Sequence, residues 1–203
     1  MELSKVTMIL RGYNVEQVRT VAEVLLHAKY VRNMEITLNT DNAYEIIRII
    51  SDEFQGKLNI GAGTVQTYDE LKKAVDAGAK FVLSPRQMTA DMLAYCKERG
   101  IVSVPGSFTP SEIGDQFAMG ADIVKIFPAN ELSLKYAKKV CEPMGDLKLM
   151  AVGGINRGNV REALDSGYKY VGTAAGLFPK EQILQMDKEK MLISLKEFEA
   201  ELD

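Results

Sequence analysis

Short apolar segments alternate with amphipathic helical segments from one end of this sequence to the other. The apolar segments are residues 6–10, 34–38, 58–61, 81–83, 101–104, 123–127, 147–152 and 168–172. Brief apolar runs separated by helical patterns are typical of parallel strands joined by crossover helices. Eight such units predict an α/β fold of the (β/α)₈ TIM-barrel type.

The boundaries between units support this assignment. Four predicted helices end in a glycine just before the next strand, at Gly78, Gly100, Gly120 and Gly167, which suits left-handed C-caps. A doubly wound open sheet is the alternative, but no GxGxxG pattern follows a strand. The chain has 203 residues and contains no linker or low-complexity tract, so residues 1–203 are predicted to form a single barrel domain.

Lys125 lies in the middle of the apolar segment at 123–127. Burying an ammonium group without a partner costs several kcal/mol, and desolvation lowers the pKa of a lysine toward the neutral, nucleophilic amine. Such an amine forms a Schiff base with a carbonyl substrate. The alternative is a lysine at a strand end whose stem is buried while its amine reaches water.

Glu35 is a second ionisable residue on an otherwise apolar strand, between Met34 and Ile36. In a TIM barrel, catalytic groups lie toward the carboxyl ends of the strands, so Glu35 and Lys125 are expected to face the same barrel mouth. A carboxylate and an amine placed in this way suit an acid/base and a nucleophile. A structural ion pair of Glu35 with Lys125 or Arg11 is the other interpretation.

Gly153 and Gly154 follow the seventh predicted strand. Loops after strands seven and eight of TIM barrels often bind phosphate through backbone N–H groups, and glycine permits close approach of the anion. A tight turn between strand and helix could use the same two glycines. A phosphate site and a simple turn therefore both remain open.

Composition limits the partners and the compartment. The formal net charge of −3 offers no attraction to nucleic acid or to an anionic membrane. Cys96 and Cys141 lie far apart without CxxC or zinc-type spacing, so they are expected to be reduced thiols and not a disulfide. No cofactor is expected. With neither a signal-peptide pattern nor an apolar run of membrane-spanning length, the chain is expected to be cytoplasmic.

Several motifs resemble the 2-keto-3-deoxy-6-phosphogluconate aldolase family, which includes 4-hydroxy-2-oxoglutarate and 2-dehydro-3-deoxy-6-phosphogalactonate aldolases. They occur in the family's order from about Val6 to Phe178. The motifs are Glu35-Ile36-Thr37-Leu38-Asn39, Gly61-Ala62-Gly63-Thr64-Val65, Ser84-Pro85, Pro105-Gly106-Ser107-Phe108-Thr109-Pro110-Ser111-Glu112, Lys125-Ile126-Phe127-Pro128-Ala129 and Val152-Gly153-Gly154-Ile155.

The resemblance implies a metal-independent class I aldolase, typically a homotrimer, that reversibly cleaves a 2-keto-4-hydroxy acid to pyruvate and an aldehyde. It implies that Lys125 is the Schiff-base lysine and that Glu35 is the general acid/base. It also implies roles in substrate binding. The substrate carboxylate is assigned to Arg11 and Thr64, and the walls around its carbons to Pro85 and Phe127.

Three departures from the family pattern concern the substrate. Asn39 stands where phosphogluconate enzymes commonly carry arginine, while Arg11 on the first strand and Val152 before Gly-Gly resemble the phosphogalactonate type. Ala174-Ala175 stands where Gly-Ser usually binds phosphate, which removes one hydroxyl donor. A hydrogen bond to a charged group contributes about 1.5–3 kcal/mol, so this loss weakens phosphate binding.

The expected function is therefore cleavage of a 2-keto-3-deoxy-4-hydroxy sugar acid, phosphorylated or not, to pyruvate and an aldehyde such as glyceraldehyde 3-phosphate. An aldolase for an unphosphorylated acid such as 4-hydroxy-2-oxoglutarate is the first alternative. A keto-acid-binding protein with weak turnover is the second, prompted by Ala174-Ala175.

Overall fold

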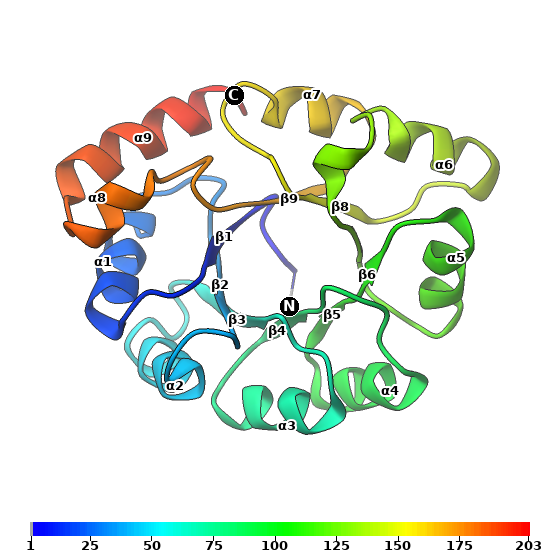
Figure 1. The fold of residues 1–203 in the computed structure, drawn as a ribbon, viewed down its shortest axis with the longest axis horizontal. Coiled ribbons are helices and arrows are strands. Elements are labelled where there is room, and N and C mark those ends of the chain that lie inside the picture. The colour runs from blue at the N-terminus through cyan, green and yellow to red at the C-terminus, as the bar shows by residue number, and fades with distance from the viewer. Residues whose placement is uncertain (1) are drawn as a thin grey trace.

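The computed structural model describes residues 2–203, whose strands form one nearly closed parallel barrel (Figure 1). The order around the sheet is β5-β4-β3-β2-β1-β9-β8-β7-β6, so strands adjacent in sequence are adjacent in space. This is the predicted TIM barrel. Its strands are β1 (Val6–Leu10), β2 (Asn33–Thr37), β3 (Asn59–Gly63), β4 (Phe81–Leu83), β5 (Val102–Val104), β6 (Gly106–Ser107), β7 (Val124–Ile126), β8 (Leu149–Val152) and β9 (Tyr170–Thr173).

Nine strands are present where eight were predicted, because Gly106–Ser107 forms a short strand after Pro105, beyond the fifth predicted segment. Proline has no N–H to donate to a ladder, but the Pro105 carbonyl still accepts a hydrogen bond from the Lys125 N–H at 2.8 Å. The part before Pro105 pairs with β4, and the part after it pairs with β7. The two short strands together fill the fifth position of the barrel.

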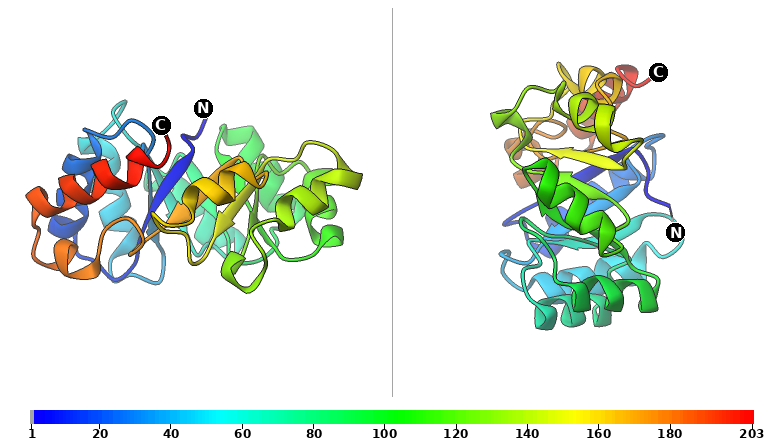
Figure 2. Two further views of the ribbon diagram at one scale, coloured as in Figure 1. Left: turned by 90° about the horizontal axis from the view of Figure 1, so that it is seen from above. Right: turned by 90° about the vertical axis from the view of Figure 1, so that its right-hand side faces the viewer.

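Helices surround the barrel on its outside, as the end-on view of Figure 1 and the side views of Figure 2 show. They are α1 (Val15–Leu25), α2 (Ala43–Glu53), α3 (Tyr68–Asp76), α4 (Ala90–Arg99), α5 (Pro110–Ala118), α6 (Tyr136–Met144), α7 (Val160–Asp165), α8 (Lys180–Leu184) and α9 (Lys188–Ala200), with a short 3₁₀ helix, η1 (Ala129–Glu131).

Capping residues fix where several helices begin and end. Asn14, Thr67 and Thr109 each cap a helix in a reciprocal capping box, which satisfies N–H groups that the first turn leaves free. The glycines predicted to end helices have positive φ values between 65° and 104°. Because glycine adopts this conformation without steric cost, each turn leads directly into the next strand.

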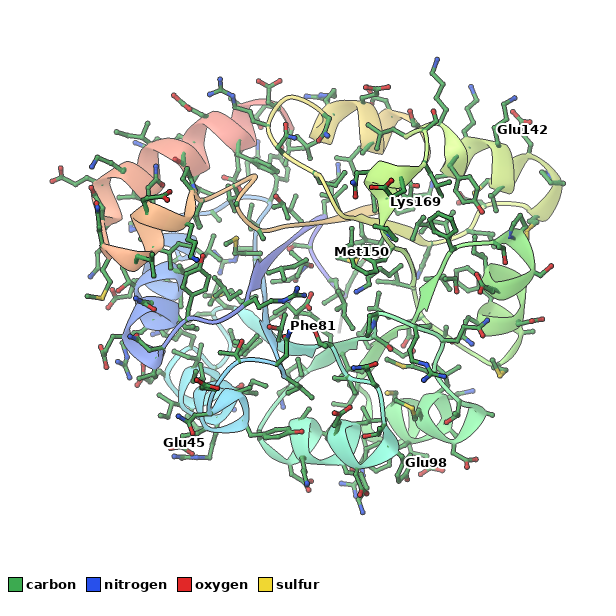
Figure 3. The ribbon with its side chains drawn as sticks, in the orientation of Figure 1. Glu45, Phe81, Glu98, Glu142, Met150 and Lys169 are labelled. Carbon is green, nitrogen blue, oxygen red and sulfur yellow. The ribbon has the colours of Figure 1, made fainter. Side chains whose placement is uncertain are left out.

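Two apolar layers hold the barrel together. One lies between the sheet and the helices, and the other fills the barrel interior with side chains such as those of Phe81 and Met150, which lie near the barrel axis in Figure 3. Successive side chains of a strand point to opposite faces. Val124 and Ile126 belong to the outer layer, so Lys125 between them points into the barrel. The same alternation turns Glu35 inward.

Candidate active site

Lys125 is held inside the barrel near its mouth. Its side chain is buried, with the residue only 5% exposed, so little of the lysine is in contact with water. The Lys125 Nζ lies 4.9 Å from the centroid of the Phe127 ring. The amine therefore lies over the face of an aromatic ring. None of the hydrogen bonds described for residues 2–203 uses this nitrogen, so no hydrogen bond occupies its lone pair.

Glu35 is buried in the same interior, 3% exposed, and is packed against β3. Its Oε1 occupies the space where a side chain at position 63 would lie, because a Cβ on Gly63 would be 1.5 Å from that oxygen. Its Oε2 has no hydrogen-bond partner among the described residues. Nor does Glu35 take part in any ion pair within 4.0 Å in this part of the chain, so a close structural ion pair does not explain its burial.

Burial moves both groups toward their neutral forms. Desolvation lowers the pKa of the Lys125 amine, with the Glu35 charge opposing this and the Arg11 charge adding to it. Desolvation raises the pKa of the Glu35 carboxyl, with the charges of Lys125 and Arg11 opposing the rise. Shifts in these directions favour the two forms that addition to a carbonyl uses, a nucleophilic amine and a proton-donating acid.

Thr64 follows β3 directly and has φ of 60°, a left-handed conformation that is rare for a β-branched residue. Such strain costs about 1–3 kcal/mol and is found mostly at functional sites. Because Thr64 comes one residue after Gly63, the strained turn lies beside the Glu35 carboxylate. No feature of the sequence by itself indicates this backbone conformation.

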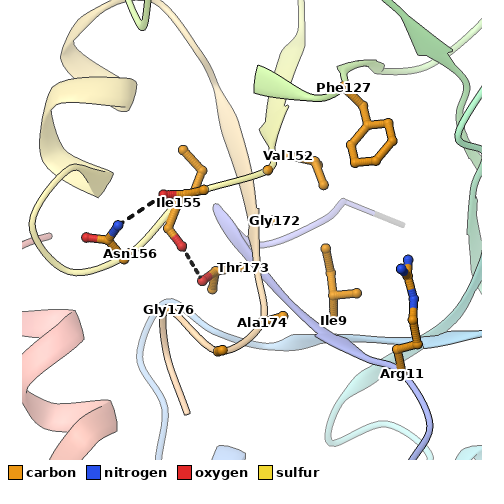
Figure 4. Close-up of a pocket in the computed structure, with 13 residues that line it drawn as sticks. Ile9, Arg11, Phe127, Val152, Ile155, Asn156, Gly172, Thr173, Ala174 and Gly176 are labelled. Atoms are coloured by element: carbon orange, nitrogen blue, oxygen red, sulfur yellow. Dashed lines mark hydrogen bonds between the residues drawn. The ribbon is translucent and has the colours of Figure 1, made fainter. Parts of the chain in front are cut away.

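A cavity of about 440 Å³ lies at the carboxyl ends of β1, β8 and β9 (Figure 4). Most of the residues that the sequence assigned to substrate and phosphate binding line this cavity. Arg11 and Phe127 lie at one end and the loop after β9 at the other. The predicted residues that line it are Arg11, Phe127, Val152, Gly153, Gly154, Ala174 and Ala175.

The Gly153-Gly154 turn packs closely on η1. Both glycines have positive φ, 110° and 71°, and a Cβ at either would lie 2.7–2.8 Å from an atom of Asn130. Glycine is therefore required for the turn itself, whether or not an anion binds there. Ala174 and Ala175 are exposed at the opposite wall, and neither carries a polar side chain.

Other predicted residues lie outside this cavity. Asn39 is exposed in the turn after β2. Pro85 lines a separate hollow on the other side of Phe127. Thr64 is half-buried, and it lines neither of these spaces.

Sequence reasoning did not single out several residues that shape the site. Gly63 makes room for Glu35, and the small residues at 61–63 opposite a strand carboxylate could have indicated it. Ile9 and Thr173 also line the cavity, where the Thr173 hydroxyl donates to the Ile155 carbonyl at 2.7 Å. Because this hydroxyl already hydrogen-bonds to the Ile155 backbone, it fixes the conformation of the loop after β8.

Comparison with known proteins agrees with this geometry. Residues 1–193 match the model of the KDPG and KHG aldolase family, the aldolases of 2-keto-3-deoxy-6-phosphogluconate and 4-hydroxy-2-oxoglutarate. The chain belongs to this family. Membership makes it a class I aldolase and confirms the resemblance, the barrel and the reaction class predicted from the sequence.

Individual relatives carry several substrate names. The chain is 30% identical over 171 residues to a probable 2-dehydro-3-deoxy-6-phosphogalactonate aldolase of Rhizobium meliloti, covering 84% of this chain and 80% of that protein. It is 33% identical over 135 residues to the KHG/KDPG aldolase of Escherichia coli K12, covering 66% and 62%.

A solved structure of KDPG aldolase from Legionella pneumophila, with pyruvate captured at low pH as a covalent carbinolamine intermediate, has a similar fold. It superposes with a TM-score of 0.83 at 28% identity, covering 97% of this chain and 93% of that one.

Two kinds of feature are absent from the described residues, 2–203. No group of three or more histidine, cysteine, aspartate or glutamate side chains is placed to hold a metal ion. None of the helices is both long enough and apolar enough to cross a membrane.

Proposed function

We propose that Lys125 is the Schiff-base residue and Glu35 the proton-transfer residue for cleavage of a 2-keto-3-deoxy-4-hydroxy acid. The observation that carries this assignment is the burial of both groups in one interior with opposite pKa shifts. Desolvation favours the neutral amine that attacks the keto carbon, and it favours the protonated carboxyl that can give a proton to the departing hydroxyl.

The Lys125 amine adds to C2, and the Glu35 carboxyl donates a proton to the carbinolamine hydroxyl, which leaves as water to give a protonated imine and a Glu35 carboxylate. This carboxylate takes the proton of the C4 hydroxyl, the C3–C4 bond breaks, and its electron pair moves into the iminium to give an enamine. The aldehyde leaves, and the Glu35 carboxyl returns the proton to C3. Water then hydrolyses the protonated imine to pyruvate and the free amine, and Glu35 takes up the proton that this step releases.

Four further residues are assigned to substrate binding: Arg11, Thr64, Pro85 and Phe127. Arg11 offers a forked pair of N–H donors for the carboxylate of the substrate, which would hold the keto carbon near Lys125. Thr64 supports the same carboxylate from the strained turn after β3. Pro85 and Phe127 provide apolar walls, and the contact of Phe127 with the Lys125 amine supports its place beside the reacting carbons.

The distal phosphate is assigned to the 440 Å³ cavity. Backbone N–H groups of Gly153, Gly154, Ala174 and Ala175 are the proposed donors. The missing serine hydroxyl lowers affinity by roughly tenfold or more, since it removes about 1.5–3 kcal/mol. A phosphogalactonate-type substrate is favoured over phosphogluconate by Arg11, Asn39 and Val152, and by the similarity to the Rhizobium meliloti protein.

A coupled assay of pyruvate release tests this function. Wild-type protein is given the two phosphorylated keto-deoxy acids and 4-hydroxy-2-oxoglutarate, with Lys125→Met and Glu35→Gln as controls. We expect turnover of at least one phosphorylated acid above that of 4-hydroxy-2-oxoglutarate, and loss of turnover in both variants. Faster cleavage of the unphosphorylated acid would reassign the substrate, and undiminished activity of Lys125→Met would overturn the mechanism.

A homotrimer and a cytoplasmic location complete the proposal. Both come from the family resemblance, and the two free cysteines are compatible with a reducing compartment. Light scattering coupled to size exclusion tests the trimer, and a mass near that of the 22.5 kDa chain would contradict it.

A further inference from the structure

Two asparagine side chains in the loop after β8 hydrogen-bond to the same backbone carbonyl. The Asn156 Nδ2 donates to the Gly154 carbonyl at 3.0 Å, and the Asn159 Nδ2 donates to it at 2.9 Å. The next carbonyl, that of Ile155, accepts a hydrogen bond from the Thr173 hydroxyl at 2.7 Å. Side chains therefore fix two successive peptide groups at the wall of the cavity of about 440 Å³.

The oxygens of the two carboxamides are also in use. The Asn159 Oδ1 accepts the N–H of Asn156 at 2.8 Å, and the Asn156 Oδ1 accepts the N–H of Gly158 at 2.8 Å. Each amide thus accepts with its oxygen and donates with its nitrogen, which fixes its orientation. Asn159 precedes α7 but makes no capping hydrogen bond to that helix. Its side chain therefore stabilises the loop and not the end of the helix.

The direction of the Gly154 carbonyl determines the direction of the next N–H. In a trans peptide group the carbonyl and the N–H point to opposite sides, so the Ile155 N–H points away from both asparagine side chains. Ile155 lines the cavity, and Figure 4 shows Asn156 at the opposite end of it from Arg11. No acceptor is described for the Ile155 N–H within residues 2–203. This donor is therefore available to an anion in the cavity.

A turn made of two glycines needs such support, because glycine has the least restricted backbone of any residue. Without contacts from side chains, Gly153 and Gly154 would present their N–H groups in several orientations. Donors stabilise an anion most when they are already in place before it binds. Asn159 does not line the cavity, so its influence on a bound anion must act through the conformation of this loop.

We propose that Asn159, together with Asn156, is a positioning residue for the distal phosphate of the substrate. Through the Gly154 carbonyl, it orients the backbone N–H donors of the loop after β8 toward the anion. This role rests on the proposed function, because it takes the cavity as the phosphate subsite of an aldolase. Ala174 and Ala175 bring no side-chain donor to that subsite, so binding of the phosphate depends strongly on how the backbone donors are oriented.

Condensation of pyruvate with D-glyceraldehyde 3-phosphate and with neutral D-glyceraldehyde tests this role. Asn159→Ser keeps a residue that helix N-termini favour and removes the carboxamide. We expect its kcat/KM to fall about threefold to tenfold for the phosphorylated acceptor, through KM, and less than twofold for the neutral one. Asn159→Asp keeps the acceptor for the Asn156 N–H but places an oxygen against the Gly154 carbonyl. It should lower kcat/KM for the phosphorylated acceptor at least as much.

Comparison of the two acceptors separates positioning from a general structural role. Equal losses for both acceptors, or an unchanged ratio of the two kcat/KM values in both variants, would overturn the positioning role. A wild type without preference for the phosphorylated acceptor would overturn the phosphate assignment of the proposed function, and the positioning role with it. Borohydride trapping of pyruvate on Lys125 should be the same in Asn159→Ser as in wild type. Loss of trapping in that variant alone would also overturn a role confined to the phosphate.

Discussion

Glu35 and Gly63 face each other across β2 and β3 with no space between them, since a Cβ on Gly63 would lie 1.5 Å from Glu35 Oε1. Gly63→Ala must therefore displace the carboxylate that the proposed mechanism uses for proton transfer. We expect kcat to fall by about 100-fold or more, the usual contribution of a positioned acid/base.

Gly61→Ala is the matched control for this substitution. A Cβ there would meet the Phe81 ring at 2.5 Å, so this variant overpacks the same strand against Phe81 and not against the Glu35 carboxylate. Both variants are expected to lose about 1–3 kcal/mol of stability by urea denaturation. The account is contradicted if Gly61→Ala and Gly63→Ala lose kcat equally while both remain folded.

The pKa of the Lys125 amine should respond to its two charged neighbours in opposite directions. Removing Arg11 takes away a charge that lowers this pKa, so Arg11→Gln raises it. Removing Glu35 takes away a charge that raises it, so Glu35→Gln lowers it further. Competitive acetylation across pH, followed by mass spectrometry of the Lys125 peptide, measures both shifts. Exposed Lys196 on α9 is the internal reference, and shifts of the same sign would refute the arrangement.

Replacing Lys125 by methionine should stabilise the protein, with a characteristic pH dependence. The folded pKa of Lys125 lies below its usual 10.5, so between the two values the unfolded chain binds a proton that the folded chain does not. Stability of the wild type therefore rises with pH through this window. Glu35, whose folded pKa is raised, contributes with the opposite sign in both proteins.

We expect Lys125→Met to gain about 1–4 kcal/mol at pH values below the folded pKa of Lys125, as for other buried charges replaced by apolar residues of similar size. The gain should shrink as the pH rises toward 10.5. Urea denaturation of both proteins across this range measures it. Lys196→Met, an exposed control, should show no such trend, and a gap that widens with pH would contradict the sign.

Replacing Thr64 with glycine should preserve or raise the stability of the protein and weaken its binding of the keto acid. Thr64→Gly relieves the strain of a φ of 60°, so we expect the melting temperature to stay constant or rise while KM for the keto acid increases about tenfold. Met186 has a similar φ of 53° and lines none of the spaces around Lys125, so Met186→Gly should keep both KM and kcat. An unchanged KM in Thr64→Gly would remove Thr64 from the site.

Much of this architecture could be predicted from the sequence because it depends on local patterns. Apolar runs located the strands, glycines such as Gly78 located helix ends, and a charge on an apolar strand located Lys125 and Glu35. Relations across the barrel could not be predicted in this way. The fit of Gly63 around Glu35 and the strained turn at Thr64 both depend on how separate strands approach one another.

The central claim is that the Lys125 amine forms the imine, and borohydride reduction in the presence of pyruvate tests it most directly. The account predicts an irreversible pyruvate adduct on the peptide that contains Lys125, with activity lost in proportion to labelling. Lys125→Met should take up no adduct at that position. An intact wild-type protein that is reduced without any adduct on Lys125, or that carries the adduct on another lysine, would contradict the account.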